Sequence, residues 1–297
     1  MLAFSVAQPL VLGISNGAAI GLVAIGLVLI YKSSRVFNFV AGEFVTLGAF
    51  GTYVGDKVLK LPYPLAIALG LLFGLMAGLV TERLVIRPLA NRPRVTILVA
   101  TAALASLLIP VEIIIGGAKF FGARPIVGGL GFKVPVADVY MSWQQLIIVC
   151  TLAAAGVGLA WFFGRTDLGL AVLATSQEPT ASRLVGIRLN RITLLTWGLA
   201  GLLGAVAGVL LAPVTSQFQA GYGTTTVLIA AFTAAVVGGM TSVPGAFVGG
   251  LLVGLVQAFA QINISSKTLP GANSVATLVM LLAVLLVRPT GLLGKEA

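Results

Sequence analysis

Glu43 is the residue in this 297-residue chain whose type and position point most directly to chemistry. It is the only charge between positions 36 and 55. A carboxylate at membrane depth is costly unless it faces the protein interior, water or a partner, so Glu43 is a candidate functional residue by default. Thr46 lies close to the same helical face, whereas Asn38 lies roughly 140° away on an ideal helix. Asn38, Glu43 and Thr46 are our pathway candidates.

Two other interpretations of Glu43 stay open. Its carboxylate could bond neighbouring backbone or hydroxyl groups and lock the helices together. Alternatively, a break at Gly42 would place Glu43 near an exposed helix end.

The chain lacks the residues that several other kinds of chemistry require. It has no histidine and one cysteine, so His-based catalysis and an intrachain disulfide are excluded. Lys267 and Lys295 lack the glycine spacing of a phosphate-binding P-loop, so the chain cannot hydrolyse ATP by that route. We assign it no catalytic residue, no metal ligand and no cofactor of its own.

The composition indicates where Glu43 lies. Hydrophobic residues make up 59% of the chain and charged residues 9%, with a mean hydropathy of +1.10. Soluble domains carry about 25% charged residues, so this is an integral membrane protein. The net charge of +10 belongs to short loops between apolar runs, which argues against a nucleic-acid partner.

A membrane-crossing helix needs about 20 apolar residues. The charge-poor stretches therefore predict an all-α polytopic protein of one domain, 1–297, with about nine spans, or eight if one segment is re-entrant. The predicted spans are 8–30, 36–55, 61–81, 95–111 (extending to 115), 139–164, three within 192–266, and 273–287. Pro88 and Pro93 should interrupt the helix after the third span.

Two connections have distinct patterns. The glycine-rich linker 116–138 alternates weakly and predicts a short hairpin or an interfacial segment. The run from Gly238 to Gly245, with Gly239 and Pro244 inside it, predicts a tight interhelical turn. A broken helix lining a pathway is the alternative for that run.

Glycines recur at helical spacing in two spans. Gly70, Gly74 and Gly78 share one face of the third span, and Gly201, Gly204 and Gly208 nearly do so in a later one. Small residues at this spacing let helix backbones approach closely in lipid. We expect them to serve packing and not substrate binding.

The segment 165–191 is the most polar in the chain. Pro179 suits the first turn of a short helix and Gly186 its end. Ala181, Leu184 and Val185 give that helix an apolar stripe. Such a helix could bind lipid headgroups, but docking on a soluble partner is the sharper interpretation.

Placing alternate loops on opposite sides tests the span assignment. One side collects twelve basic residues and the other six, which predicts an external N-terminus and a cytoplasmic C-terminus. The larger set is Lys32, Arg35, Arg83, Arg87, Arg92, Arg94, Arg165, Arg183, Arg188, Arg191, Arg288 and Lys295.

Six segments in order resemble the permease subunits of branched-chain amino-acid ABC importers. They are Asn16–Tyr31, Phe37–Phe44, Glu82–Leu89, Ser176–Ile187, Gly238–Gly250 and Arg288–Gly294. The resemblance implies a bacterial inner-membrane subunit that pairs with a second permease, identical or paralogous. It also implies two cytoplasmic ATPase subunits, which would bind ATP and Mg, and an external solute-binding protein.

The resemblance also implies that the loop around Ser176–Ile187 couples transport to the ATPase. The residues that would carry this coupling are Gln177, Glu178, Pro179, Ala181, Ser182, Arg183 and Gly186. One position departs from the family, because members often carry His-Gly-Glu where this chain has Ala41-Gly42-Glu43.

The implied function is an importer permease for a small solute, foremost branched-chain or other hydrophobic amino acids. Urea, amides or small carboxylated solutes are the alternative substrates. An ion-coupled secondary transporter that uses Glu43 is the alternative of a different class.

Overall fold

The computed structural model describes residues 7–129, 131–134, 139–264, 269–288 and 290–294. Within these residues, six helices are long and apolar enough to cross a membrane, and two shorter apolar helices accompany them. The all-α polytopic fold is therefore confirmed. The six are α1 (Ala7–Ser34), α3 with its extension (Tyr63–Leu89), α5 (Arg94–Gly116), α6 (Trp143–Arg165), α9 (Leu189–Leu211) and α12 (Val243–Asn263); the two shorter are α11 (Leu228–Gly238) and α13 (Ala272–Val287).

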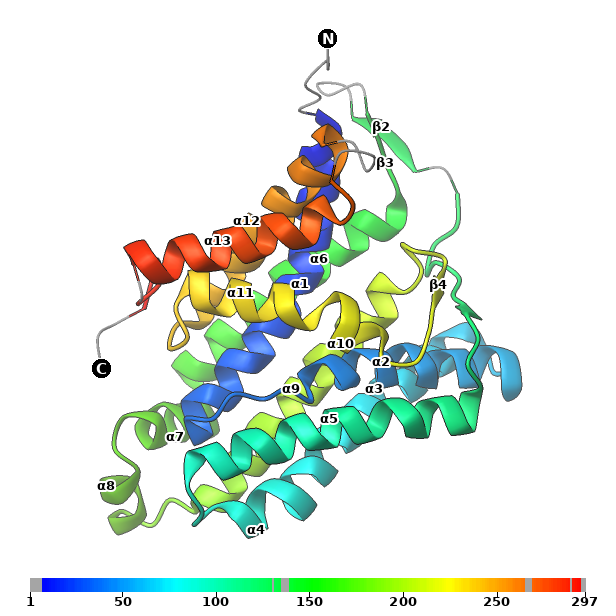
Figure 1. Ribbon diagram of the computed structural model, residues 1–297. Helices are drawn as coiled ribbons and strands as arrows, with labels where there is room; N and C mark the ends of the chain where they lie inside the picture. Colours follow the sequence, from blue (N-terminus) through cyan, green and yellow to red (C-terminus); the bar gives the residue numbers. More distant parts are fainter. Residues whose placement is uncertain (1–6, 130, 135–138, 265–268, 289, 295–297) are drawn as a thin grey trace.

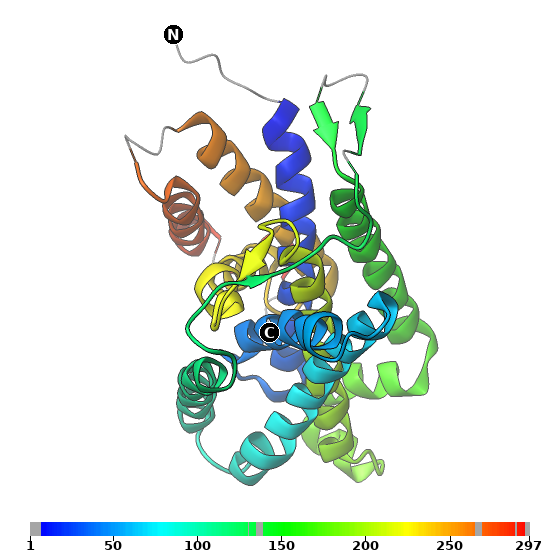
Figure 2. The ribbon, with the colours of Figure 1, turned by 90° about the vertical axis from the view of Figure 1, so that its right-hand side faces the viewer.

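Helix α1 runs through the middle of the molecule (Figures 1 and 2). Every residue from Gly17 to Ile30 is buried, so this helix is apolar all round instead of amphipathic. Helices α12, α9, α11 and α6 pack around it. The core of the protein is thus a central helix with its neighbours wrapped about it.

The predicted glycine stripes face each other across α3 and α9. A Cβ at Gly201 would overlap the carbonyl oxygen of Gly74, and one at Gly78 would overlap that of Trp197. Gly208 meets the carbonyl of Val45 on α2 (Ala41–Tyr53) in the same way. The packing role predicted for these glycines is confirmed.

Helices α1 and α12 make a second contact of this kind. A Cβ at Gly254 would overlap the backbone of Gly17, and one at Gly250 would overlap that of Gly21. Backbone approach without side chains between the helices explains how α1 can be covered so completely.

The second span begins later than predicted. Residues 36–40 are not helical, and α2 starts at Ala41 and continues into a π-helical turn, η1 (Val54–Val58). Asn38 therefore lies before the helix, and the helical angle predicted between Asn38 and Glu43 is wrong. The Asn38 side chain accepts a hydrogen bond from the backbone N–H of Val40 (2.9 Å), which favours a turn there over helix.

Two further span boundaries differ from the sequence prediction. Helix α5 continues to Gly116 and includes Glu112. After α3 (Tyr63–Thr81), a π-helical turn, η2 (Glu82–Ile86), leads into α4 (Arg87–Leu89), so Pro88 does not end the helix. A π-turn displaces the hydrogen-bond ladder, so the missing N–H of proline is tolerated there.

The linker forms the predicted hairpin. Strand β2 (Phe132–Val134) pairs antiparallel with β3 (Val139–Met141), and β1 (Phe121–Gly122) pairs with β4 (Gln217–Phe218). The fifth span consequently starts at Trp143 and not at Val139. Ser142 and Gln145 form a capping box there, which fixes the start of α6.

The uncharged stretch 192–266 contains three helical segments in its described part, as predicted, of which the first is α9, the last is α12, and the middle one is broken. It consists of α10 (Tyr222–Thr226) and α11, which meet at Val227. Neither piece alone approaches the roughly 20 residues of a full crossing. Two helices of the polar loop, α7 (Asp167–Gln177) and α8 (Pro179–Leu184), complete the fold.

We predict that Gly201→Val destabilises the protein by about 1–3 kcal/mol, because the added side chain must displace the α3 backbone. Thermal unfolding in detergent would measure this as a lower Tm. Gly158→Val on α6 is the matched control, since nothing lies within 4 Å of a Cβ there. Equal Tm values for the two variants would contradict the packing role.

Candidate functional site

Glu43 lies in the first turn of α2 and is completely buried. The interpretation in which a break places it at a helix end is right about the position, but the end is enclosed and not exposed. Backbone N–H groups at a helix N-terminus favour a nearby carboxylate. The short α2 therefore carries Glu43 into the protein interior.

Glu112, which no pattern in the sequence singled out, lies opposite Glu43. It comes from α5, is 5% exposed, and accepts a hydrogen bond from the backbone N–H of Gly221 (2.9 Å). Gly221 is the residue before α10 and has a positive φ of 68°. Glu112 thus holds the start of the broken helix, and Glu43 is not the only acid among the spans.

The two carboxyl groups lie close to each other, and Thr224 and Thr46 lie beside Glu43. Both oxygens of Glu43, Oε1 of Glu112 and the Thr224 hydroxyl are buried without a hydrogen bond of good geometry. Among the described residues, none of the three ion pairs involves either glutamate. The cluster Glu43–Glu112–Thr224 therefore has unused acceptors and no cation.

Thr46 connects α2 to α10. Its hydroxyl oxygen accepts a hydrogen bond from the N–H of Gly223 (3.0 Å). A Cβ at Gly223 would overlap the carbonyl oxygen of Gly42, so the two helices touch through their backbones. Thr46 thus lies near the Glu43 face as predicted.

Asn38 is buried, and its Nδ2 has no partner among the described residues. The neighbouring Phe39 N–H donates to the hydroxyl of Thr101 on α5 (3.4 Å). Helices α5 and α10 both lie beside α2 (Figure 1), and the Phe39–Thr101 hydrogen bond fastens the segment before α2 to α5.

Two facing carboxyl groups in a dry interior repel each other when both are ionised. A shared proton or a bound cationic group, such as an ammonium, would relieve this repulsion. The described residues contain no cluster of three acidic, His or Cys side chains that could hold a metal ion. Proton sharing and ammonium binding are the chemistries that this arrangement can support.

The polar loop presents an exposed helix. Pro179 lies at the first turn of α8, and Gly186 (φ 87°) follows its end, as predicted. Leu184 and Val185 are 85% and 77% exposed. Of the other coupling candidates, Ser182 is buried, whereas Gln177, Glu178, Ala181 and Arg183 are exposed. The apolar stripe of this helix has no covering within the described chain.

The run 238–245 forms the tight turn between α11 and α12. The Ser242 hydroxyl caps α12 by accepting from the N–H of Gly245 (3.0 Å), and Pro244 lies in the first turn. Gly239 has a positive φ of 102°. The backbone N–H of Leu293 donates to the carbonyl of Gly238 (3.0 Å), so the chain end covers this turn. The helix break lies instead at Val227.

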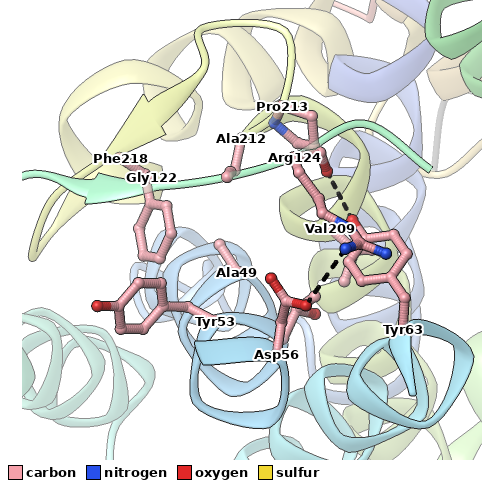
Figure 3. Close-up of a pocket in the computed structure, with 12 residues that line it drawn as sticks. Ala49, Tyr53, Asp56, Tyr63, Gly122, Arg124, Val209, Ala212, Pro213 and Phe218 are labelled. Atoms are coloured by element: carbon pink, nitrogen blue, oxygen red, sulfur yellow. Dashed lines mark hydrogen bonds and ion pairs between the residues drawn. The ribbon is translucent and has the colours of Figure 1, made fainter. Parts of the chain in front are cut away.

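A small pocket lies at the C-terminal end of α2, where Ala49, Thr52 and Tyr53 line it (Figure 3). Arg124 stacks 4.1 Å from the Tyr63 ring centre and lies 3.7 Å from the Asp56 carboxylate. The Tyr63 hydroxyl donates to the Arg124 carbonyl (2.6 Å). The cavity is about 20 Å³, which suits a water molecule and not a solute. These contacts fasten the segment around β1 to α3.

The sequence matches a family model described as the branched-chain amino acid transport system / permease component over residues 10–287. It is 30% identical to the high-affinity branched-chain amino acid transport system permease protein BraD of Pseudomonas aeruginosa, over 97% of this chain and 95% of that protein. It is also 30% identical to the probable branched-chain amino acid transport permease protein LivH of Methanocaldococcus jannaschii, over 93% and 88%.

A solved structure has a similar fold. PsaBC from Streptococcus pneumoniae in complex with Fab superposes with a TM-score of 0.51 at 16% identity, covering 95% of this chain and 91% of that one. At this identity the likeness concerns the fold alone.

We predict that Glu112→Leu destabilises the protein by about 1–3 kcal/mol, because the Gly221 N–H loses its acceptor in a dry environment. Glu112→Gln keeps a side-chain oxygen at that place and should unfold near the wild-type Tm. Thermal unfolding in detergent compares the two. If both variants lose the same stability, the hydrogen bond to α10 is not what Glu112 contributes.

Proposed function

The chain belongs to the family of branched-chain amino acid transport system permease components, and we propose that it forms the translocation pathway of an ATP-driven importer for branched-chain amino acids. The observation that carries this proposal is the family match across 10–287, which spans nearly every described helix. The relatives BraD and LivH are named as permeases for these solutes, which supports the same substrate class here.

The proposal includes partners that this chain needs. Two ATP-binding subunits would supply the ATP and Mg chemistry, since the sequence has no P-loop. A second permease, identical or paralogous, would complete the pathway, and an external solute-binding protein would deliver the substrate. The exposed apolar stripe of α8 supports docking on an ATPase subunit.

The orientation follows from charge. The basic residues at the ends of α1 and α9 nearest to α7 and α8 belong to the larger set of twelve, which supports a cytoplasmic position for these helices. The N-terminus then lies outside and the C-terminus inside a bacterial inner membrane. Lys267 and Lys295, which enter this count, lie outside the described residues.

A short connection supports coupling between α8 and the glutamate cluster. The guanidinium of Arg35, just after α1, donates to the carbonyl of Ser176 on α7 (3.0 Å). The chain then passes through the extended residues 36–40 into the first turn of α2, where Glu43 lies.

The second candidate function is ion-coupled transport. The Glu43–Glu112 pair favours it, because a carboxyl pair can carry protons. Proteoliposomes separate the two mechanisms. We expect branched-chain amino acid uptake only when ATPase subunits, ATP and the binding protein are present. Uptake by this chain alone, driven by an ion gradient, would overturn the proposal.

We predict that Gly186→Pro and Glu178→Arg uncouple ATP hydrolysis from uptake. Proline cannot adopt the positive φ of Gly186 and lacks the N–H that donates to the Arg183 carbonyl (3.0 Å). The measurement is solute transported per ATP hydrolysed. Lys60→Glu, an exposed charge reversal away from α8, serves as control. Normal coupling in both variants would refute the docking assignment.

We predict that Glu43→Ala and Glu43→Gln impair transport more than they impair assembly. Neither carboxyl oxygen of Glu43 makes a hydrogen bond of good geometry, so its loss leaves no described partner unsatisfied. Transport per assembled complex, with assembly followed by gel filtration, measures the difference. Poor assembly combined with normal transport per complex would assign Glu43 to structure only.

A further inference from the structure

A groove separate from the glutamate cluster opens between α1, α6 and α12. Helices α6 and α12 both pack on α1 but make few contacts with each other, which leaves Ile25 of α1 at the bottom. The groove has a volume of about 830 Å³, within the range of pockets that hold organic ligands. Its size sets it apart from the water-sized pocket beside Arg124.

The long walls of this groove are apolar. One wall is α6 and the other is the first half of α12, and the outer rim is open, since Val157 is 72% exposed. The wall residues are Ala153, Gly156, Val157, Ala160, Phe247 and Val248.

One end of the groove is cationic. Lys32 and Arg35 line it beside the end of α7 and the turn that contains Thr241 and Ser242. The Lys32 ammonium lies 5.7 Å from the Phe163 ring centre, and Arg35 uses one donor on the Ser176 carbonyl. Neither forms an ion pair with a carboxylate in the described ranges, so several donors stay unused.

We propose that this groove binds an anionic glycerophospholipid from the leaflet on the α7–α8 side. The headgroup phosphate bonds Lys32 and Arg35, and the hydroxyls of Thr241 and Ser242 add donors. An acyl chain lies between α6 and α12 along the apolar walls.

The arrangement of the groove favours this occupant. Ile25 and Lys32 are seven residues apart on α1, so the apolar floor and the cationic end are separated by about 10 Å along the helix. An amphiphile with one negative end matches that order, whereas a small polar solute would leave the walls uncovered. Basic pockets between membrane helices on the cytoplasmic side bind anionic headgroups. The lipid would hold α6 and α7 against α1, close to the Arg35–Ser176 contact.

The experiment uses the full chain in its assembled complex, reconstituted in nanodiscs of phosphatidylglycerol and phosphatidylcholine and analysed by native mass spectrometry. We expect the wild type to retain phosphatidylglycerol selectively. Lys32→Gln combined with Arg35→Gln should lower that retention about tenfold or more, because both attractions to the phosphate are lost. Lys57→Gln with Lys60→Gln removes two charges elsewhere and should leave retention unchanged.

A second pair of variants tests the apolar walls without changing charge. A Cβ at Gly156 would lie 3.2 Å from the Phe247 ring, so Gly156→Leu fills the groove, whereas Gly158 on the same helix has nothing within 4 Å. We expect Gly156→Leu to lower lipid retention and Gly158→Leu to leave it intact. Wild-type retention in both the charge variant and Gly156→Leu would overturn the proposal.

A photo-crosslinking residue at position 157 separates a lipid from a protein neighbour. We expect its main product to contain phospholipid. A main product joined to another protein subunit would mean that a partner covers the groove, and the lipid assignment would be wrong.

Discussion

Helices in a membrane gain little by burying apolar side chains against one another, because lipid chains are as apolar as leucine. What holds this bundle is backbone contact through glycine, at Gly201 against Gly74 and at Gly254 against Gly17. The first contact joins α3 to α9 and the second joins α12 to α1. Because α9 also packs on α1, the α3–α9 pair and α12 are both attached to the central helix α1. The placement of α2, and with it Glu43, depends on this framework through Gly208.

The buried glutamates differ in whether a cation offsets the cost of burying the carboxyl group. Glu82 is 1% exposed and forms a two-bonded ion pair with Arg87 (2.9 and 3.2 Å), which offsets its desolvation. In the part of the chain that the structure describes, Glu43 and Glu112 have no such cation and face each other instead. Two facing carboxyl groups without a cation are costly for stability, so the burial of this pair is not offset in the way that the burial of Glu82 is.

The sequence predicted the spans with long uncharged runs and the role of the glycine stripes, because composition and spacing determine both. It failed where a boundary depends on tertiary contacts. The longer predicted end of the fourth span, at 115, takes in Glu112, but no local pattern marks this residue as a site, because its partner, the N–H of Gly221, lies 109 positions away. The late start of α2 depends on the Asn38 turn and on Thr101 of another helix. A local sequence pattern cannot predict hydrogen-bond partners that lie far away in the sequence.

Two hydrogen bonds and a short segment link the polar loop 165–191 to the glutamate cluster. Helix α7 is joined to the end of α1 by the Arg35–Ser176 hydrogen bond, and only residues 36–40 separate Arg35 from α2. Five residues can take up little displacement, and their middle is fastened to α5 by Phe39 and Thr101. A shift of α7 must therefore either break the Arg35 bond or move the first turn of α2. That turn carries Glu43, so a shift of α7 and the position of the Glu43 carboxyl group are mechanically related.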